Sequence, residues 1–283
     1  MKILGILVIP VLVYLGISSF SAIRAIEVPR IPLNDTPASV GLDYEDVSFP
    51  SRDNVTLRGW YIPATGETTI IMISSGAQNR IDPGIGAPEM TRDLVMKGFN
   101  ILLFDQRGRG ESEGKGLLLV NASQDIGGAV DYIKNRNSGD IIIMGFSLGA
   151  ALSLTCQEDV AAIISDTSFT NVKEMFIRQT TIETNLPEPI IKFLAPGIFL
   201  MAKVIYGYDA VNPIDRVADI SCPILFIHGE ADNNILPDDV VKLFEASDNP
   251  SDELWIVPGA GHCQGYRSSP ISYIDIITKF LTR

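Results

Sequence analysis

The 283-residue chain has few of the residues that build disulfide frameworks, metal sites or nucleic-acid surfaces. Its three cysteines are scattered, and no CxxC or Cys/His cluster suggests zinc. Basic residues number only 22 against 34 acidic ones, and the resulting net charge of -12 repels phosphate backbones. We therefore expect no nucleic-acid partner, no metal and no organic cofactor. A hydrophobic content of 46% also excludes a disordered chain.

The N-terminal run from Ile3 to Ile23 contains no charged residue. As a helix with a rise of 1.5 Å per residue it spans roughly 30 Å, the thickness of a bilayer core. We predict a single-pass membrane anchor over residues 1–23, with the working hypothesis that the following domain lies outside the cytoplasm. The alternatives are a signal cleaved near Ala22, which would release a secreted protein, and a buried helix.

The remaining chain predicts an α/β fold. A β-hairpin is expected over residues 44–62. Short β-branched runs follow at 69–73, 100–104, 140–144, 160–164, 223–227 and 253–257, with helical patterns at 88–97, 123–135, 148–157, 237–246 and 270–281. Repeated β-α units predict a three-layer structure around a mostly parallel sheet, with the chemistry at the carboxyl ends of the strands.

Two segments depart from this alternation. Residues 24–40 hold three prolines and few apolar side chains, which predicts a linker before a single domain at 41–283. Residues 171–219 contain apolar helical segments but no strand, so we expect a cap inserted over the active edge. An elongated crossover helix is the alternative for the second segment.

A nucleophile candidate lies in the pentapeptide Gly145-Phe-Ser-Leu-Gly149, which matches the pattern G-x-S-x-G. It follows a predicted strand and opens a predicted helix. A tight turn there lifts the Ser147 hydroxyl above the sheet near a helix N-terminus, where the dipole favours an oxyanion. Serine also caps helices, but capping does not require both glycines.

With this motif in place, the chain from about residue 43 to 281 resembles the α/β-hydrolase superfamily, and within it the Bem46-like or serine-aminopeptidase-type branch. The resemblance implies a serine hydrolase with a helical cap. It rests on blocks in the right order: Leu57-Arg-Gly-Trp-Tyr-Ile-Pro63, Phe104-Asp-Gln-Arg-Gly-Arg-Gly-Glu-Ser112, the pentapeptide, Asn212-Pro-Ile-Asp215, Cys222-Pro-Ile-Leu-Phe-Ile-His-Gly-Glu-Ala-Asp232 and Pro258-Gly-Ala-Gly-His262.

In this fold the serine is followed along the chain by an acid and then by a histidine. That order gives Ser147, Asp232 and His262 as the catalytic residues. Asp166, which follows the preceding strand, is the rival acid. His228 is the rival base, and the resemblance assigns it a structural role.

The oxyanion hole requires two backbone N–H groups. We assign them to Leu148 and Ala77, with Gln78 as the alternative to Ala77. The superfamily usually has His-Gly in the second loop, whereas this chain has Ser74-Ser-Gly-Ala-Gln-Asn-Arg80.

The leading hypothesis is a membrane-anchored serine hydrolase that cleaves esters or thioesters of small or lipid-like acyl substrates through an acyl-enzyme. The alternatives are a small serine peptidase and a catalytically inactive protein that uses the same fold for binding.

Overall fold

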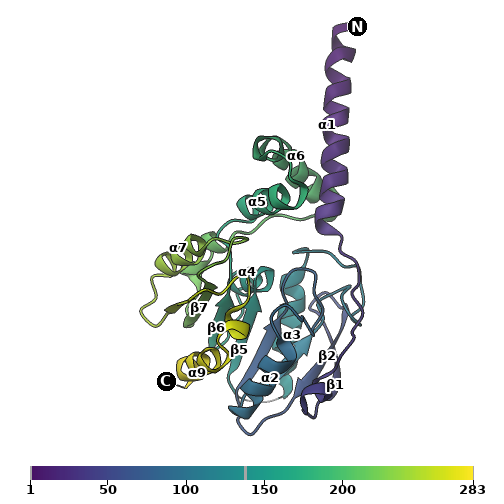
Figure 1. Cartoon of the computed structure of the whole chain (residues 1–283). Coiled ribbons are helices and arrows are strands. Elements are labelled where there is room, and N and C mark those ends of the chain that lie inside the picture. Colours follow the sequence, from purple (N-terminus) through teal and green to yellow (C-terminus); the bar gives the residue numbers. More distant parts are fainter. Residues whose placement is uncertain (1, 137–138, 283) are drawn as a thin grey trace.

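The computed structural model describes residues 2–136 and 139–282, and its centre is one eight-stranded sheet (Figure 1). The strand order is β1-β2-β4-β3-β5-β6-β7-β8. Strands β1 (Glu45–Pro50) and β2 (Thr56–Ile62) form the predicted antiparallel hairpin, and β2 also pairs antiparallel with β4. All other pairs are parallel. The parallel strands are β3 (Thr69–Ile73), β4 (Asn100–Phe104), β5 (Ile141–Phe146), β6 (Ala162–Asp166), β7 (Ile224–Gly229) and β8 (Glu253–Val257).

Helices cover both faces of the sheet, because the parallel strands are apolar on both sides. Ile70 and Met72 of β3 pack in the cluster that contains α2 (Ala87–Met96) and α9 (Pro270–Leu281). Ile71 and Ile73 point the other way, into the cluster with α3 (Ala122–Arg136). The latter face also carries α4 (Leu148–Thr155) and α7 (Pro237–Ser247), and the short α8 (Gly265–Ser268) precedes α9. This is the predicted three-layer α/β-hydrolase fold.

The insertion between β6 and β7 is helical. It contains α5 (Val172–Thr184) and α6 (Glu188–Tyr206), followed by the short 3₁₀ helices η2 (Pro213–Asp215) and η3 (Val217–Asp219). Figure 1 shows α5 and α6 above the sheet, between α1 and α7. The insertion therefore contains two separate helices, whereas the alternative prediction was one elongated crossover helix.

Helix α1 (Lys2–Ile26) projects away from the sheet at the end where α5 and α6 lie (Figure 1). Within the part of the chain that the structure describes, two helices are long and apolar enough to cross a membrane: residues Ile9–Ile26 of α1, and α6. Signal sequences and buried core helices meet the same criteria, so length and composition alone do not separate these possibilities.

The segment predicted to be a linker lies along the domain rather than free of it. Helix α1 extends three residues beyond the predicted end of the anchor, and a 3₁₀ turn, η1 (Pro37–Val40), precedes β1. Between them, the Val28 amide donates to the Gly116 carbonyl at 3.0 Å. The Arg30 guanidinium donates to the carbonyls of Gly110 and Ser112, each at 2.7 Å. These bonds fix where α1 leaves the domain.

Candidate active site

Ser147 lies at the turn between β5 and α4, as the pentapeptide predicts. Its backbone angles are φ 51° and ψ −112°, a strained conformation for a residue with a side chain. The turn is so tight that a Cβ on Gly145 would lie 2.2 Å from the Gly149 carbonyl oxygen. A Cβ on Gly149 would lie 2.4 Å from the Ile73 carbonyl oxygen. Both glycines are therefore required by the close approach of the backbone.

The structure brings the three predicted catalytic residues together from three loops. The Nε2 atom of His262, in the loop after β8, lies 3.1 Å from the Ser147 Oγ. The Nδ1 atom of the same ring lies 2.8 Å from Oδ2 of Asp232, which follows β7. In the tautomer with its proton on Nδ1, His262 donates to Asp232 and accepts from the serine hydroxyl.

The surroundings of Asp232 keep its carboxylate ionised. Burial raises the pKa of Asp232, but the hydrogen bond and charge of His262 and two backbone amides lower it by more, so the pKa lies below its usual value. The amides are those of Asn234, at 2.8 Å, and Ile235, at 3.1 Å, and both donate to Oδ1. The other oxygen, Oδ2, is thereby left facing the imidazole.

The rival acid and base make other contacts. Asp166 is almost completely buried and accepts a hydrogen bond from the Tyr273 hydroxyl at 2.7 Å. Burial raises the pKa of Asp166, which favours a neutral carboxyl. His228 is fully buried, and its Nε2 lies 2.9 Å from the Ile235 carbonyl but 3.6 Å from Asp232. His228 therefore contacts the loop that carries Asp232, and it is His262 that lies within hydrogen-bond distance of the serine.

The two predicted oxyanion donors lie at different elements. Leu148 is the first residue of α4, directly after the serine. In the loop after β3, Ser75 and Gly76 line the pocket that contains Ser147. The amide of Gln78 donates to the Ser75 carbonyl at 3.0 Å and so serves a turn. This favours the assignment of Ala77, rather than Gln78, as the second donor.

Other reactive or charged side chains near this edge have structural contacts. The Arg80 guanidinium stacks 4.0 Å from the centre of the buried Trp60 ring, and its backbone amide donates to Asp105 at 2.8 Å. Asn79 donates to the Pro32 carbonyl at 3.0 Å. Burial raises the pKa of Cys263 well above its usual value, so its thiol is not activated. Among residues 2–136 and 139–282, no group of three or more His, Cys, Asp or Glu side chains forms a metal site.

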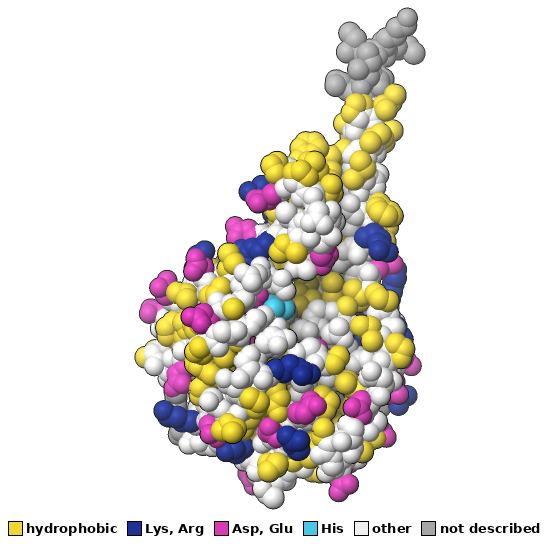
Figure 2. Space-filling model, in the orientation of Figure 1, with side chains coloured by type: hydrophobic (Ala, Val, Ile, Leu, Met, Phe, Trp, Pro, Cys, Tyr) yellow, Lys and Arg dark blue, Asp and Glu magenta, His cyan; other side chains and the backbone are white. Residues whose placement is uncertain are grey.

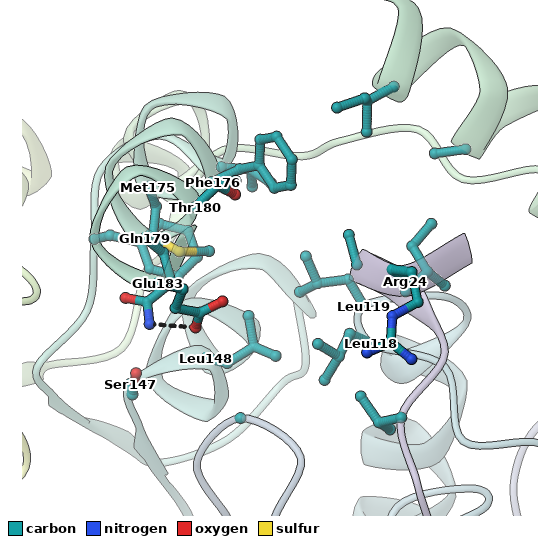
Figure 3. Close-up of a pocket in the computed structure, with 18 of the residues that line it drawn as sticks. Arg24, Leu118, Leu119, Ser147, Leu148, Met175, Phe176, Gln179, Thr180 and Glu183 are labelled. Carbon is teal, nitrogen blue, oxygen red and sulfur yellow. Dashed lines mark hydrogen bonds between the residues drawn. The ribbon is translucent and has the colours of Figure 1, made fainter. Parts of the chain in front are cut away.

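A largely apolar pocket of about 700 Å³ opens above the serine. Figure 3 shows Leu118 and Leu119 on one side of it and side chains of α5 on the other, with Leu148 below Glu183 and with Gln179 and Glu183 joined by a hydrogen bond above Ser147. In Figure 2 a histidine is visible beside a hollow with hydrophobic atoms, and because His228 is buried this is His262.

One wall of this pocket was not predicted from the sequence. Residues Ser21, Ala22, Arg24, Ala25 and Ile26 of α1 and Val28 after it line the pocket, although their composition predicted only an anchor and a linker. Ser18 and Ala22 are completely buried. The available signal was the spacing of small residues at 18, 22 and 25, which places them on one face of a helix.

The sheet, the strained serine turn and the imidazole beside it define an α/β hydrolase. The model of the prolyl oligopeptidase family matches residues 91–283. The chain belongs to this family, which supports hydrolase activity.

Relatives and solved structures agree on the fold. The α/β hydrolase domain-containing protein WAV2 of Arabidopsis thaliana is 26% identical over 268 residues, covering 88% of this chain and 82% of the relative. The protein YqkD of Bacillus subtilis is 26% identical over 245 residues, a match that covers 82% of this chain and 77% of YqkD. The esterase Pf2001 of Pyrococcus furiosus superposes with a TM-score of 0.77 and 25% identity, over 92% of this chain and 98% of the esterase.

Proposed function

We propose that this protein is a membrane-anchored serine hydrolase that cleaves ester or thioester bonds of acyl substrates. The observation that carries the proposal is the continuous hydrogen-bonded line from Ser147 through His262 to Asp232 at the floor of an apolar pocket. A serine hydroxyl is a poor nucleophile at neutral pH, and an adjacent imidazole activates it.

In the acylation step, the Ser147 Oγ attacks the substrate carbonyl carbon while His262 Nε2 takes the hydroxyl proton. The oxyanion of the tetrahedral intermediate accepts hydrogen bonds from the amides of Leu148 and Ala77. The carbon–oxygen or carbon–sulfur bond then breaks, and His262 returns its proton to the leaving alcohol or thiol. Asp232 stabilises the imidazolium that exists between these two proton transfers.

In the deacylation step, water takes the place of the leaving group. His262 removes a proton from water, the resulting hydroxide attacks the acyl-enzyme carbonyl, and the proton returns to Ser147 Oγ as the carboxylic acid departs. The net reaction is hydrolysis, with no change in the enzyme.

An acyl substrate is supported by the apolar lining of the pocket and by the likeness to the Pf2001 esterase. A second candidate, a small serine peptidase, is favoured by the family model, whose name is that of a peptidase family. Hydrolysis rates of nitrophenyl esters of increasing acyl-chain length, compared with those of aminoacyl and peptidyl amides, discriminate the two. An acyl hydrolase should cleave the esters faster than the amides, and its rate on the esters should rise with acyl-chain length.

Retention of α1 is part of the proposal, because removal of a signal near Ala22 would delete Ser21 from the pocket wall and Tyr14, which bonds Phe193 and Gly197 of α6. Mass spectrometry of the protein isolated from membranes should find the N-terminal segment intact. Protease accessibility on intact cells tests the orientation, and full protection of the domain would contradict an extracytoplasmic location.

The catalytic assignment is tested with a fluorophosphonate probe, which labels activated serines. The wild-type protein should be labelled at Ser147, and the variant Ser147→Ala should lose both labelling and turnover. A neighbouring substitution, Ser153→Ala, serves as the control, since Ser153 is buried in α4 and its hydroxyl donates to the Ala150 carbonyl. Unchanged labelling of Ser147→Ala, or no labelling of folded wild-type protein, would exclude this mechanism.

A further inference from the structure

Helix α6 carries two apolar stripes, of which one is buried against the protein and the other is largely exposed. Phe193 of the exposed stripe meets the Tyr14 ring of α1 edge-to-face, with the ring centres 5.3 Å apart. The buried stripe consists of Ile191, Ala195, Ile198 and Ala202. The second stripe is exposed, and consists of Ile190, Phe193, Leu200 and Val204. The buried stripe has steps of four, three and four residues and the exposed stripe steps of three, seven and four, so each lies along one face of the helix. A surface helix in water normally carries polar side chains on its outer face, so this exposed stripe points to an apolar environment.

The charges of α6 are confined to its ends. Glu188 pairs with Lys192 in the first turns, and Lys203 pairs with Asp209 at 2.8 Å beyond the last turn. The stretch from Phe193 to Ala202 contains no charged residue. A helix whose charges are paired with one another, and whose central stretch is uncharged, can be placed in an apolar environment at a lower cost than one with unpaired charges.

Helix α6 packs along α1 in the same direction. Near one end, the Tyr14 hydroxyl donates to the Phe193 carbonyl at 3.1 Å, and at the other the Tyr206 hydroxyl donates to Glu27 at 2.6 Å. Both pairs are 179 residues apart in the sequence, so the two helices keep one register along the contact. In Figure 1, α6 lies beside the domain-proximal part of α1.

The contact between the helices is built from small residues. A Cβ on Gly197 would lie 2.3 Å from the Ser18 Oγ. The Gly197 amide also donates to the Tyr14 hydroxyl at 3.0 Å, in the turn where Pro196 interrupts the helix. Close backbone approach through small residues, with polar side chains bonded across, is typical of helix pairs inside membranes.

The shared register sets the depth of α6. If the charge-free run from Ile3 to Ile23 fills a bilayer core of about 30 Å, Tyr14 lies near its middle and Ile23 at the edge nearest the domain. The part of α6 beside Tyr14–Ile23, residues 193–202, is then level with one leaflet. The same register places the Glu188–Lys192 ion pair beside residues 9–13 of α1, close to the bilayer middle, where mutual pairing lowers the cost of the two charges. Helix α5 is too polar to cross, since it carries Lys173, Glu174, Arg178, Gln179 and Glu183. The α5–α6 hairpin therefore enters one leaflet and does not span the membrane.

We propose that α6 is embedded beside α1 in the leaflet nearest the domain, and that the pocket between them receives the acyl chain of a bilayer lipid directly from that leaflet. The proposal rests on the proposed function and names its substrate as a membrane lipid ester. Both helices contribute walls to the pocket above Ser147: residues 21–26 of α1, and Ile198, Phe199 and Ala202 of α6. An acyl chain that enters beside these helices leaves lipid for a pocket whose lining is largely apolar, with Arg24, Gln179 and Glu183 among its polar residues.

The first test uses the full-length protein in phosphatidylcholine vesicles and the double variant Leu200→Gln/Val204→Gln. These side chains are 53% and 67% exposed, and neither lines the pocket. Hydrolysis of vesicle-embedded long-chain diacylglycerol should fall at least tenfold, while hydrolysis of water-soluble nitrophenyl acetate stays within twofold. The matched control is Ile271→Gln on α9, which is 79% exposed and distant from α1, and it should change neither rate (Figure 1).

A second measurement is independent of catalysis. In the Ser147→Ala background, tryptophan is placed at Leu200 or at Ile271, and its fluorescence is recorded in vesicles of brominated phosphatidylcholine. Quenching of the Leu200→Trp protein alone supports the proposal. Absence of that quenching overturns it, and a cross-linked dimer through α6 would identify a second copy of the chain as the occupant.

The outcomes separate the two levels of inference. If the wild-type protein hydrolyses neither diacylglycerol nor nitrophenyl acetate, the proposed function is contradicted. If the wild-type protein hydrolyses both substrates and the double variant hydrolyses them at the same rates, entry of the acyl chain from the leaflet is contradicted, and the hydrolase assignment is unaffected.

Discussion

Two buried carboxylates lie near His262, and replacing each in turn shows which of them assists catalysis. Asp232 faces Nδ1 at 2.8 Å, whereas Asp166 is bonded to the Tyr273 hydroxyl. In Asp232→Asn the uncharged amide no longer stabilises the imidazolium and no longer fixes the Nδ1–H tautomer. We expect kcat to fall by about 10⁴, which corresponds to about 5.4 kcal/mol at 1.36 kcal/mol for each factor of ten.

The matched substitution Asp166→Asn has a different expected outcome. Burial already raises the pKa of Asp166, and an amide oxygen can still accept from Tyr273. The loss is a weakened buried hydrogen bond of about 0.5–1.5 kcal/mol in the free energy of unfolding. Because Asp166 is bonded to Tyr273 and not to the His262 ring, kcat should change by less than about threefold, which is about 0.65 kcal/mol in the activation barrier.

Steady-state hydrolysis of nitrophenyl butanoate and the rate of fluorophosphonate labelling provide the assay, with thermal unfolding in detergent as the check on folding. If folded Asp232→Asn retains more than a tenth of wild-type kcat, the role given to Asp232 is incorrect. If Asp166→Asn lowers kcat more than Asp232→Asn does, the catalytic acid is Asp166 at the end of β6.

Three further predictions follow from contacts described by the structure. A Cβ at Gly197 would lie 2.3 Å from α1, whereas a Cβ at Gly16 would meet nothing within 4 Å. Gly197→Val should therefore reduce the preference for nitrophenyl decanoate over nitrophenyl acetate about tenfold, which corresponds to the loss of about two buried methylene contacts. Gly16→Val should leave this preference unchanged. Arg107 donates to the buried Asp125 at 2.7 Å, so Arg107→Met leaves an unpaired charge and should lower the free energy of unfolding in urea by about 3–5 kcal/mol; a loss below 1 kcal/mol would be inconsistent with a buried pair. Hydrogen bonds from Arg107 lower the pKa of Asp53 to about 2, below an unfolded value of about 3.9, so this contribution to stability is complete above about pH 4 and is lost as pH falls toward 2. Urea midpoints measured between pH 2 and 6 should therefore depend less on pH in Asp53→Asn than in the wild-type protein, and parallel curves would contradict the assignment.

The strands were predictable because short β-branched runs identify a sheet covered on both faces. The predicted ranges 69–73, 100–104 and 253–257 coincide with β3, β4 and β8. The predictions for β5, β6 and β7 end two residues too early, before Phe146, Asp166 and Gly229. Polar residues and glycines at the carboxyl ends of these strands interrupt the hydrophobic pattern at the edge where Ser147 lies.

The serine turn was predictable for a similar local reason. Two glycines flanking one serine between a strand and a helix indicate a close backbone approach, and the short distances at Gly145 and Gly149 account for it. The positions of Asp232 and His262 after their strands follow from the parallel topology.

The pocket wall formed by α1 was not predictable by the same means. The sequence of a membrane-spanning apolar helix does not show which face packs against protein, because every face can contact lipid. The choice of Ser18 and Ala22 as the buried face depends on α6, which comes almost two hundred residues later.

That separation in sequence has a consequence for biogenesis. Helix α1 is made before the sheet, and its partner α6 leaves the ribosome only after strands β1 to β6 have been translated. During this interval the small-residue groove around Ser18 has no native neighbour, and the newly made helix is open to pairing with copies from adjacent ribosomes. Assembly of the pocket is thus a late event in maturation, and neither its wall nor the Ser147–His262–Asp232 arrangement is complete until translation has passed His262.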